Sequence, residues 1–222
     1  MKNVVVRLVF SYSLLWIAVP HHTFAQGTPP YQHYRYSEFQ SATVKLKDGT
    51  TTETSLNYNL ITEQIILDLG HTKIPYPQTD LVDEVHFGDV VLIPADKFFL
   101  ELLEIGTVSL LVRRSQKVTQ IGQDTGYGTT SQTSTSLTPG GLHQTDYIYQ
   151  HNLPDDYSTE DRNQYYLKRH EDIHEVKSLK KACKFIPELE KELMDFAKSH
   201  RIKIEREEDM RKWVRYSNDN LP

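Results

Sequence analysis

Apolar and polar positions alternate in short segments through the first half of the chain, which predicts strands. The alternation from Ala42 to Lys47 is followed by Asp48-Gly49, a turn pair that tolerates positive φ, and the threonine-rich stretch 50–55 favours an extended return strand. Further apolar extended segments, separated by turns at Gly70, Gly88 and Gly106, cover 64–69, 82–87, 90–93, 98–105 and 108–113. This short spacing of turns predicts an antiparallel meander, closed or sandwiched so that its edges are hidden.

Helical periodicity replaces the strand pattern after residue 177. Ser178 begins a helical pattern that continues to Lys184. Pro187 opens a second helix, which has glutamates near its positive end and apolar residues on one face: Glu188, Glu190 and Glu192, and Leu189, Leu193, Phe196 and Ala197. A last helix is expected from Glu207 to Tyr216, with Met210, Trp213 and Val214 as its buried stripe. Such stripes are typical of a core rather than of a cofactor site.

The two patterns together predict an α+β fold. An antiparallel β-rich domain over 37–177, a meander that is sandwich- or barrel-like, precedes a small C-terminal helical segment over 178–222. The β pattern is interrupted at 122–141, where 14 of 20 residues are Gly, Ser or Thr. A segment with so few apolar side chains cannot bury enough apolar surface to become ordered, so we expect a flexible loop. Its aromatic residue, Tyr127, is a candidate binding residue. Tyrosine-rich extended segments at 146–150 and 164–168 then complete the sheet.

The first 25 residues have the pattern of a secretory signal peptide. Lys2 and Arg7 precede an apolar run from Leu8 to Val19, which is shorter than the ~20 residues that a membrane-spanning helix needs. Small residues before Gln26 suit cleavage there. We therefore expect an exported protein, periplasmic, on the outer-membrane surface or secreted, with no stable membrane insertion once 1–25 is removed and with 26–36 as an N-terminal extension.

Charge and cysteine content limit the classes of partner and of cross-link. Removal of residues 1–25 deletes two basic and no acidic residues and takes the net charge from -5 to -7. Because neutralising phosphates requires an excess of Lys and Arg, we expect no nucleic-acid partner.

A single cysteine, Cys183, excludes an intramolecular disulfide and is expected as a small buried residue on a helix. The alternatives are a disulfide to a second chain and, because of lysines at 180, 181 and 184, a thiol with a lowered pKa.

One stretch matches a motif that carries chemistry. His170-Glu171-Asp172-Ile173-His174 fits H-E-x-x-H, in which two imidazoles on one helix face bind zinc and the glutamate acts as general base. The alternative metal ligands are therefore His170 and His174, with Glu171 as the alternative catalytic residue. A third ligand would come from Glu188, Glu190 or Glu192.

The surroundings of this motif favour a different structure. Charged residues flank it on both sides, where the helix of a zinc protease would be apolar and buried. The competing interpretation makes the segments from Tyr165 to Lys168 and from Ile173 to Lys177 the arms of a hairpin, with 169–172 as its turn. Elsewhere there is no Gly-x-Ser-x-Gly, and the carboxylate pair Asp83-Glu84 is interpreted as part of a turn.

Several segments resemble a group of uncharacterised secreted proteins of Bacteroidota. They are Leu56-Asn57-Tyr58-Asn59-Leu60 with the apolar segment after it, the stretch from Tyr127 to Thr133, and the C-terminal pattern from Tyr165 through Phe185-Ile186-Pro187 to Trp213. The likeness spans most of the chain after residue 25. It implies export and no known activity, and it implies a strand pair over 165–177.

The sequence leaves three hypotheses for function. The first is a non-enzymatic interaction module of the cell envelope or the medium, with an envelope protein or glycan as its partner and without a cofactor. The second is a zinc-dependent hydrolase that uses the motif at 170–174. The third is a glycan- or peptide-binding domain that uses exposed tyrosines, with Tyr127 as the candidate.

Overall fold

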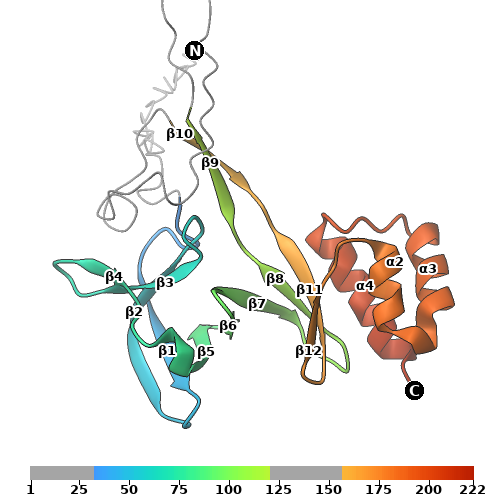
Figure 1. Ribbon diagram of the computed structural model, residues 1–222, viewed down its shortest axis with the longest axis horizontal. Helices are drawn as coiled ribbons and strands as arrows, with labels where there is room; N and C mark the ends of the chain where they lie inside the picture. The colour runs from blue at the N-terminus through green and yellow to red at the C-terminus, as the bar shows by residue number, and fades with distance from the viewer. Residues whose placement is uncertain (1–32, 121–156) are drawn as a thin grey trace, which may run out of the picture.

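The computed structural model describes residues 33–120 and 157–222 (Figure 1). Within these ranges the strands form one ten-stranded antiparallel sheet, in the order β12-β11-β8-β7-β6-β5-β1-β2-β3-β4, and a two-stranded ribbon of β9 and β10. The strands are β1 Gln40–Leu46, β2 Thr51–Asn59, β3 Gln64–Asp68, β4 Lys73–Pro75, β5 Val82–Phe87, β6 Val90–Ala95, β7 Phe98–Glu104, β8 Ser109–Arg113, β9 Gln116–Gln120, β10 Tyr157–Asp161, β11 Gln164–Arg169 and β12 Asp172–Glu175.

The predicted fold class is confirmed, because an antiparallel β-rich part precedes a helical C-terminal segment. Each hairpin expected from a glycine-containing turn is formed, and β1 pairs with β2 so that Val44 lies opposite Thr52. The expected closure is not found: β12 and β4 lie at opposite ends of the strand order, so the described sheet is open rather than a barrel. No helix in the described ranges is long and apolar enough to cross a membrane.

A narrow ribbon extends two neighbouring strands near the β12 end of the sheet. The β8 and β11 strands continue through Ser115 and Arg162 into β9 and β10, which form a separate two-stranded sheet within the described residues. The amide N of Arg162 donates to the carbonyl O of Ser115 at 2.7 Å, and Ser115 Oγ donates to the carbonyl O of Arg162 at 2.7 Å. The predicted loop at 122–141, Tyr127, the predicted strand at 146–150 and the predicted signal peptide lie outside the described residues.

Two buried asparagines explain the Leu56-Asn57-Tyr58-Asn59-Leu60 segment of β2. Asn57 is fully buried, and its amide donates to the carbonyl oxygens of Tyr36 and Glu38 while its Oδ1 accepts from the amide N of Tyr36 at 3.2 Å. Asn59 Oδ1 accepts from the amides of Ile61 and Thr62 and so closes the turn before β3. Their side chains thus satisfy backbone groups that enter or leave the sheet.

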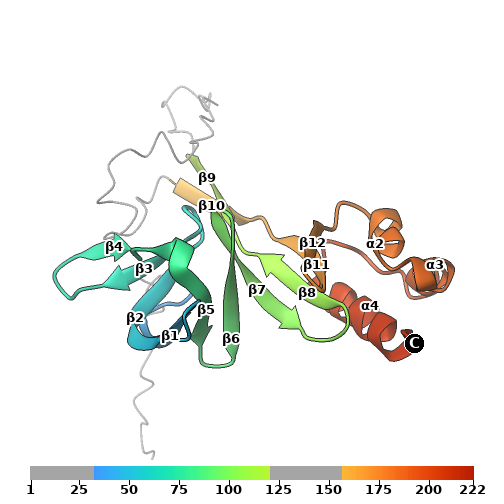
Figure 2. The ribbon, with the colours of Figure 1, turned by 60° about the horizontal axis from the view of Figure 1, so that its bottom comes forward.

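The helical segment covers one face of β7, β8 and β11. It contains α2 Leu179–Phe185, the 3₁₀ helix η2 Pro187–Leu189, α3 Glu190–Ser199 and α4 Glu207–Asn220. As predicted, Ser178 caps α2 by accepting from the amide of Lys181, and Met210, Trp213 and Val214 are buried. These residues join one apolar cluster, and β1–β7 hold a second. In Figure 2 the helices lie at one end of the sheet, away from β1–β5.

A chain of alternating charges joins the helices to the sheet. Within the described residues this ionic chain runs, in order of contact, through Arg35, Glu101, Arg114, Glu207, Arg211, Glu104 and Arg215. Its centre is Arg114, whose Nε lies 2.9 Å from Glu101 Oε2 and whose Nη2 lies 2.7 Å from Glu207 Oε2. Burial alone would lower the pKa of Arg114, but hydrogen bonds and charges of the two carboxylates hold it above its ordinary value.

A close contact at Gly106 gives a test of how α4 docks. A Cβ at Gly106 would lie 2.3 Å from Nδ2 of Asn218, an amide that bonds both the N and the O of Val108 at 2.9 Å. We expect Gly106→Ala to lower the free energy of unfolding by about 1–3 kcal/mol, because the displaced amide leaves both groups unpaired. Urea denaturation measures this. In the Asn218→Ala background the same change should cost little, and an undiminished cost there would contradict the contact.

Candidate functional site

The H-E-x-x-H segment is a hairpin and not a helix. In the register of β11 and β12, Arg169 lies opposite Asp172 and Leu167 lies opposite His174. His170 and Glu171 form the two-residue turn, and His170 has a φ of 55°. The predicted hairpin is therefore confirmed, with a shorter turn than expected.

In this hairpin the two histidines do not have the positions that a zinc site of the H-E-x-x-H type requires. The motif needs His170 and His174 one helical turn apart, whereas His170 sits in the turn and the ring of His174 packs 4.8 Å from that of Phe185. Glu188, one proposed third ligand, instead pairs with Arg169 at 2.9 and 3.0 Å. No group of three or more His, Cys, Asp or Glu that could hold a metal ion occurs within 33–120 and 157–222.

Cys183 is fully buried on α2, as the sequence predicts for a small core residue. The alternative of a thiol with a pKa lowered by neighbouring lysines is wrong. Burial, followed by the charge of Glu190, raises the pKa of the Cys183 thiol to about 11. A thiol of this kind is inert as a nucleophile near neutral pH.

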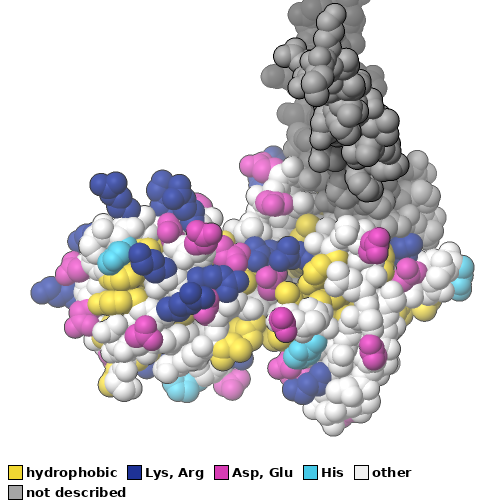
Figure 3. Space-filling view, turned by 180° about the vertical axis from the view of Figure 1, so that it is seen from behind, with side chains coloured by type: hydrophobic (Ala, Val, Ile, Leu, Met, Phe, Trp, Pro, Cys, Tyr) yellow, Lys and Arg dark blue, Asp and Glu magenta, His cyan; other side chains and the backbone are white. Residues whose placement is uncertain are grey.

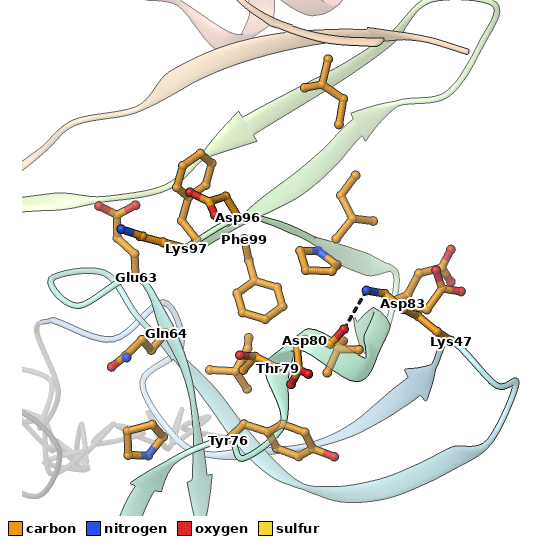
Figure 4. Close-up of a pocket in the computed structure, with 18 of the residues that line it drawn as sticks. Lys47, Glu63, Gln64, Tyr76, Thr79, Asp80, Asp83, Asp96, Lys97 and Phe99 are labelled. Carbon is orange, nitrogen blue, oxygen red and sulfur yellow. Dashed lines mark hydrogen bonds between the residues drawn. The ribbon is translucent and has the colours of Figure 1, made fainter. Parts of the chain in front are cut away.

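A hollow on the sheet brings together side chains from separate elements, and we call it the sheet cleft (Figure 4). Its volume is about 600 Å³. It is lined by Lys47, Glu63, Gln64, Ile65, Pro75, Tyr76, Thr79, Asp80, Val82, Asp83, Glu84, Ile93, Pro94, Asp96, Lys97, Phe98, Phe99, Lys168 and Ile173. Most of these residues come from β3 and β4, the 3₁₀ helix η1 Thr79–Leu81, the β5–β6–β7 strands with their turns, and the β11–β12 hairpin; Lys47 follows β1, Glu63 precedes β3 and Tyr76 follows β4.

Aromatic and aliphatic side chains form the inner surface of the sheet cleft. Phe99 points toward its middle in Figure 4, and its ring meets that of Tyr58 edge-on at 6.5 Å on the core side. Tyr76 lies on the opposite wall, where its amide donates to the carbonyl O of Ile65 at 2.8 Å. Phe99 belongs to the buried apolar cluster of β1–β7 and the Tyr76 side chain packs partly buried against that cluster, so packing holds both rings in place before any ligand arrives.

The Arg113–Glu63 pair fixes one lip of the sheet cleft. Glu63 has a φ of 58°, and both of its carboxylate oxygens accept from Arg113, the Nη2 contact being 2.7 Å. The same guanidinium lies 4.2 Å from the ring centroid of Phe98, within the range of cation–π attraction. Hydrogen bonds to Glu63 raise the pKa of Arg113 above its ordinary value.

Some charged groups in the sheet cleft are paired and others are not. Lys45 lies 2.8 Å from Asp83 and 3.6 Å from Glu84, and this pairing lowers the pKa of Asp83. The interpretation of Asp83-Glu84 as turn residues is wrong, since both lie within β5. By contrast, the carboxylates of Asp80 and Asp96 and the ammonium groups of Lys97 and Lys168 make no ion pair or hydrogen bond with the described residues.

The other hollows near the helices have a simpler lining. One of about 660 Å³ is lined entirely by residues between Lys180 and Lys198, and a smaller one by Phe196 and the outer face of α4. Figure 3 shows that Lys and Arg side chains lie interspersed with Asp and Glu over this end of the molecule. Both hollows are lined by neighbouring helices with balanced charge, whereas the sheet cleft gathers groups from elements far apart in the sequence, so the sheet cleft is the better candidate site.

Sequence reasoning did not find the sheet cleft. Its residues are separated by up to 126 positions, from Lys47 to Ile173, and only the strand pairing brings them together. The one local signal was the segment 71–81, which has prolines, a tyrosine and an aspartate but neither strand nor helix periodicity. Comparison of the chain with protein-family models, with curated proteins and with solved structures finds no match.

Proposed function

We propose that this protein is a non-enzymatic binding module that holds its ligand in the sheet cleft. The observation that carries the proposal is the combination of fixed aromatic walls with unpaired charged groups around one hollow. A cavity of about 600 Å³ falls inside the range of ligand sites, which is roughly 300–1,000 Å³. Unpaired polar groups at its margin are available to bind a partner.

The lining of the sheet cleft favours binding over catalysis. It contains no His, Cys or Ser among the described residues, and Thr79 is its one aliphatic hydroxyl. The lining therefore lacks the serine or cysteine nucleophile and the histidine base of the acyl-transfer triads. The hairpin at 170–174 likewise gives no support to a zinc-dependent hydrolase.

Export is part of the same proposal. It rests on the leader-like sequence of residues 1–25 and on the resemblance to secreted proteins of Bacteroidota. An envelope or extracellular setting would supply proteins and glycans as ligands. Protein purified from the exporting cell should begin at Gln26, and retention of residues 1–25 in the cytoplasm would refute export.

Blocking the sheet cleft tests the proposed function. The full mature chain is incubated with an envelope extract of the cells that make it, and amide hydrogen exchange is measured. We expect exchange to slow in 73–84 and 93–99, and we expect Thr79→Trp, which places an indole at the cleft from an exposed position on η1, to abolish this protection.

Thr51→Trp is the matched control, because Thr51 is exposed on β2 and does not line the sheet cleft. It should keep the protection seen in the wild type. Protection that survives Thr79→Trp, or that is confined to other segments, contradicts the proposal. Turnover of a component of the extract that Thr79→Trp abolishes would contradict its non-enzymatic part.

A further inference from the structure

We infer that the ligand of the sheet cleft is an uncharged oligosaccharide. This inference rests on the proposed function and adds the chemical class of the ligand. It uses three properties of the sheet cleft: the balance of its unpaired charges, the alternation of apolar and polar side chains around it, and the state of the strand edges beside it.

The charge balance disfavours a strongly charged ligand. Glu63 is neutralised by Arg113, and Asp83 and Glu84 are paired with Lys45. The remaining charged groups are the carboxylates of Asp80 and Asp96 and the ammonium groups of Lys47, Lys97 and Lys168. Because Lys45 carries one charge and contacts two carboxylates, the full count in and beside the sheet cleft is five carboxylates and five cations. Lys47 is itself held by a 2.6 Å hydrogen bond to the carbonyl O of Asp80. Neither a polyanion nor a polycation finds a field of one sign here.

The polar groups that remain fit hydroxyls. Carboxylates accept hydrogen bonds and ammonium groups donate them, so a ligand with both donors and acceptors on each unit can use the whole set. A sugar hydroxyl is both donor and acceptor. In Figure 4 Asp96 and Lys97 lie on one side of the sheet cleft and Thr79 and Asp80 lie on the other, so hydroxyls on both edges of a sugar ring would find partners.

The apolar surface between those polar groups fits the C–H faces of a sugar. On the β6–β7 side the lining consists of Phe99, which is only 6% exposed, and the partly exposed Pro94, while the partly exposed ring of Tyr76 follows β4 on the other side. Aromatic faces carry a partial negative charge that attracts C–H groups, and the hydroxyl of Tyr76 is in addition able to form a hydrogen bond with a sugar hydroxyl. A ligand with apolar faces and polar edges matches this arrangement better than a fully apolar one.

A peptide is the other class of uncharged ligand, and the strand edges disfavour it. Extended peptides are commonly bound by pairing with a free strand edge. Beside the sheet cleft, β3, β5, β6 and β7 each pair on both sides within the described sheet. The edge strand β4 has three residues and ends at Pro75, which has no N–H to donate, and β12 has four. Few backbone groups are thus available for a peptide.

The test is a binding titration with defined probes. The mature chain, labelled with ¹⁵N, is titrated with uncharged tri- and tetrasaccharides of α- and β-linked glucose, mannose, galactose, xylose and N-acetylglucosamine. Uncharged capped peptides of equal length are titrated in parallel. We expect at least one saccharide to shift amide signals of 76–84 and 93–99 with saturation, and the peptides to leave them unchanged.

Two variants locate the site. Asp96 has a φ of 56°, a conformation that asparagine tolerates, so Asp96→Asn removes the charge and keeps the turn. It should weaken saccharide binding at least tenfold, and Tyr76→Ala should do the same by removing the ring. Asp195→Asn on α3 and Tyr216→Ala on α4 are matched controls outside the sheet cleft and should bind as the wild type does.

The outcomes separate the ligand class from the proposed function. If no saccharide of the panel binds, or if Asp96→Asn and Tyr76→Ala both bind as the wild type does, the saccharide assignment is overturned. If peptides shift the cleft signals and saccharides do not, the ligand class is overturned while the binding function stands. If envelope extract also gives no cleft protection in the hydrogen-exchange experiment, both proposals fail.

Discussion

Replacement of Arg114 by methionine is expected to lower the free energy of unfolding by about 3–5 kcal/mol. Arg114 connects Glu101 on β7 with Glu207 at the start of α4, and the side chain of Glu101 is only 6% exposed. Methionine fills similar space but leaves the Glu101 carboxylate buried with Arg35 as its remaining partner, at 3.4 Å. The large effect thus comes from a buried carboxylate left with one more distant partner, and not from the lost contact alone.

A matched variant within the ionic chain separates the two causes. Arg215 also pairs with a glutamate, at 2.6 Å, but its side chain is 65% exposed. Water and salt screen such a pair, so Arg215→Met should change the free energy of unfolding by less than about 1 kcal/mol. Urea denaturation, which adds no salt that would screen the ion pairs, measures the free energy of unfolding of both variants. Equal effects at the two positions would refute the claim that burial is the reason why the Arg114 ion pairs contribute more to stability.

The meander was predictable because its signals are local. Asp48-Gly49, Gly88-Asp89 and Gly106-Thr107 each lie between two segments with strand propensity, and a short turn pairs the flanking strands without information from elsewhere in the chain. The helix starts were predictable for the same reason, because Ser178 and Pro187 act on the backbone of the next few residues.

Features that depend on distant residues were not predictable in this way. The β4 strand has only three residues, and nothing in Lys73-Ile74-Pro75 indicates a partner in β3. The ionic chain pairs residues that are 93 positions apart in the case of Arg114 and Glu207. Charged residues in a sequence look alike whether they will be exposed or buried, so nothing in the sequence indicated that one side of α4 pairs with β7.

The motif at 170–174 illustrates the limit of residue spacing as a signal. Two histidines four positions apart are close enough to share a metal ion only in a helix, because the same spacing along a strand separates them by about 13 Å. The chain before them, Tyr165-Tyr166-Leu167, has strand propensity and pairs with β8, which continues the sheet to the motif. His170 then adopts the left-handed conformation that a two-residue turn requires. Tertiary pairing therefore decides the conformation of the motif, and the sheet cleft gains Ile173 as a lining residue.

Truncation of Trp213 to alanine is expected to lower the free energy of unfolding by about 3–5 kcal/mol. Trp213 on α4 is fully buried in the apolar cluster that joins the helices to β7, β8 and β11. Its removal would leave a cavity between two layers that rigid strands keep apart, so the neighbouring side chains can fill it only in part. Urea denaturation followed by far-ultraviolet circular dichroism measures the loss.

Trp213→Phe is the informative companion, because the indole Nε1–H is buried and has no hydrogen-bond partner among the described residues. Phenylalanine keeps most of the ring and removes this unpaired donor, so the loss should be only about 1 kcal/mol. In Trp213→Ala, amide hydrogen exchange should speed up more in α2–α4 than in β1–β6, because β1–β6 belong to the other apolar cluster. Equal destabilisation by Trp213→Ala and Trp213→Phe would mean that the indole N–H makes a stabilising hydrogen bond that the structure does not show. The packing explanation would then be wrong.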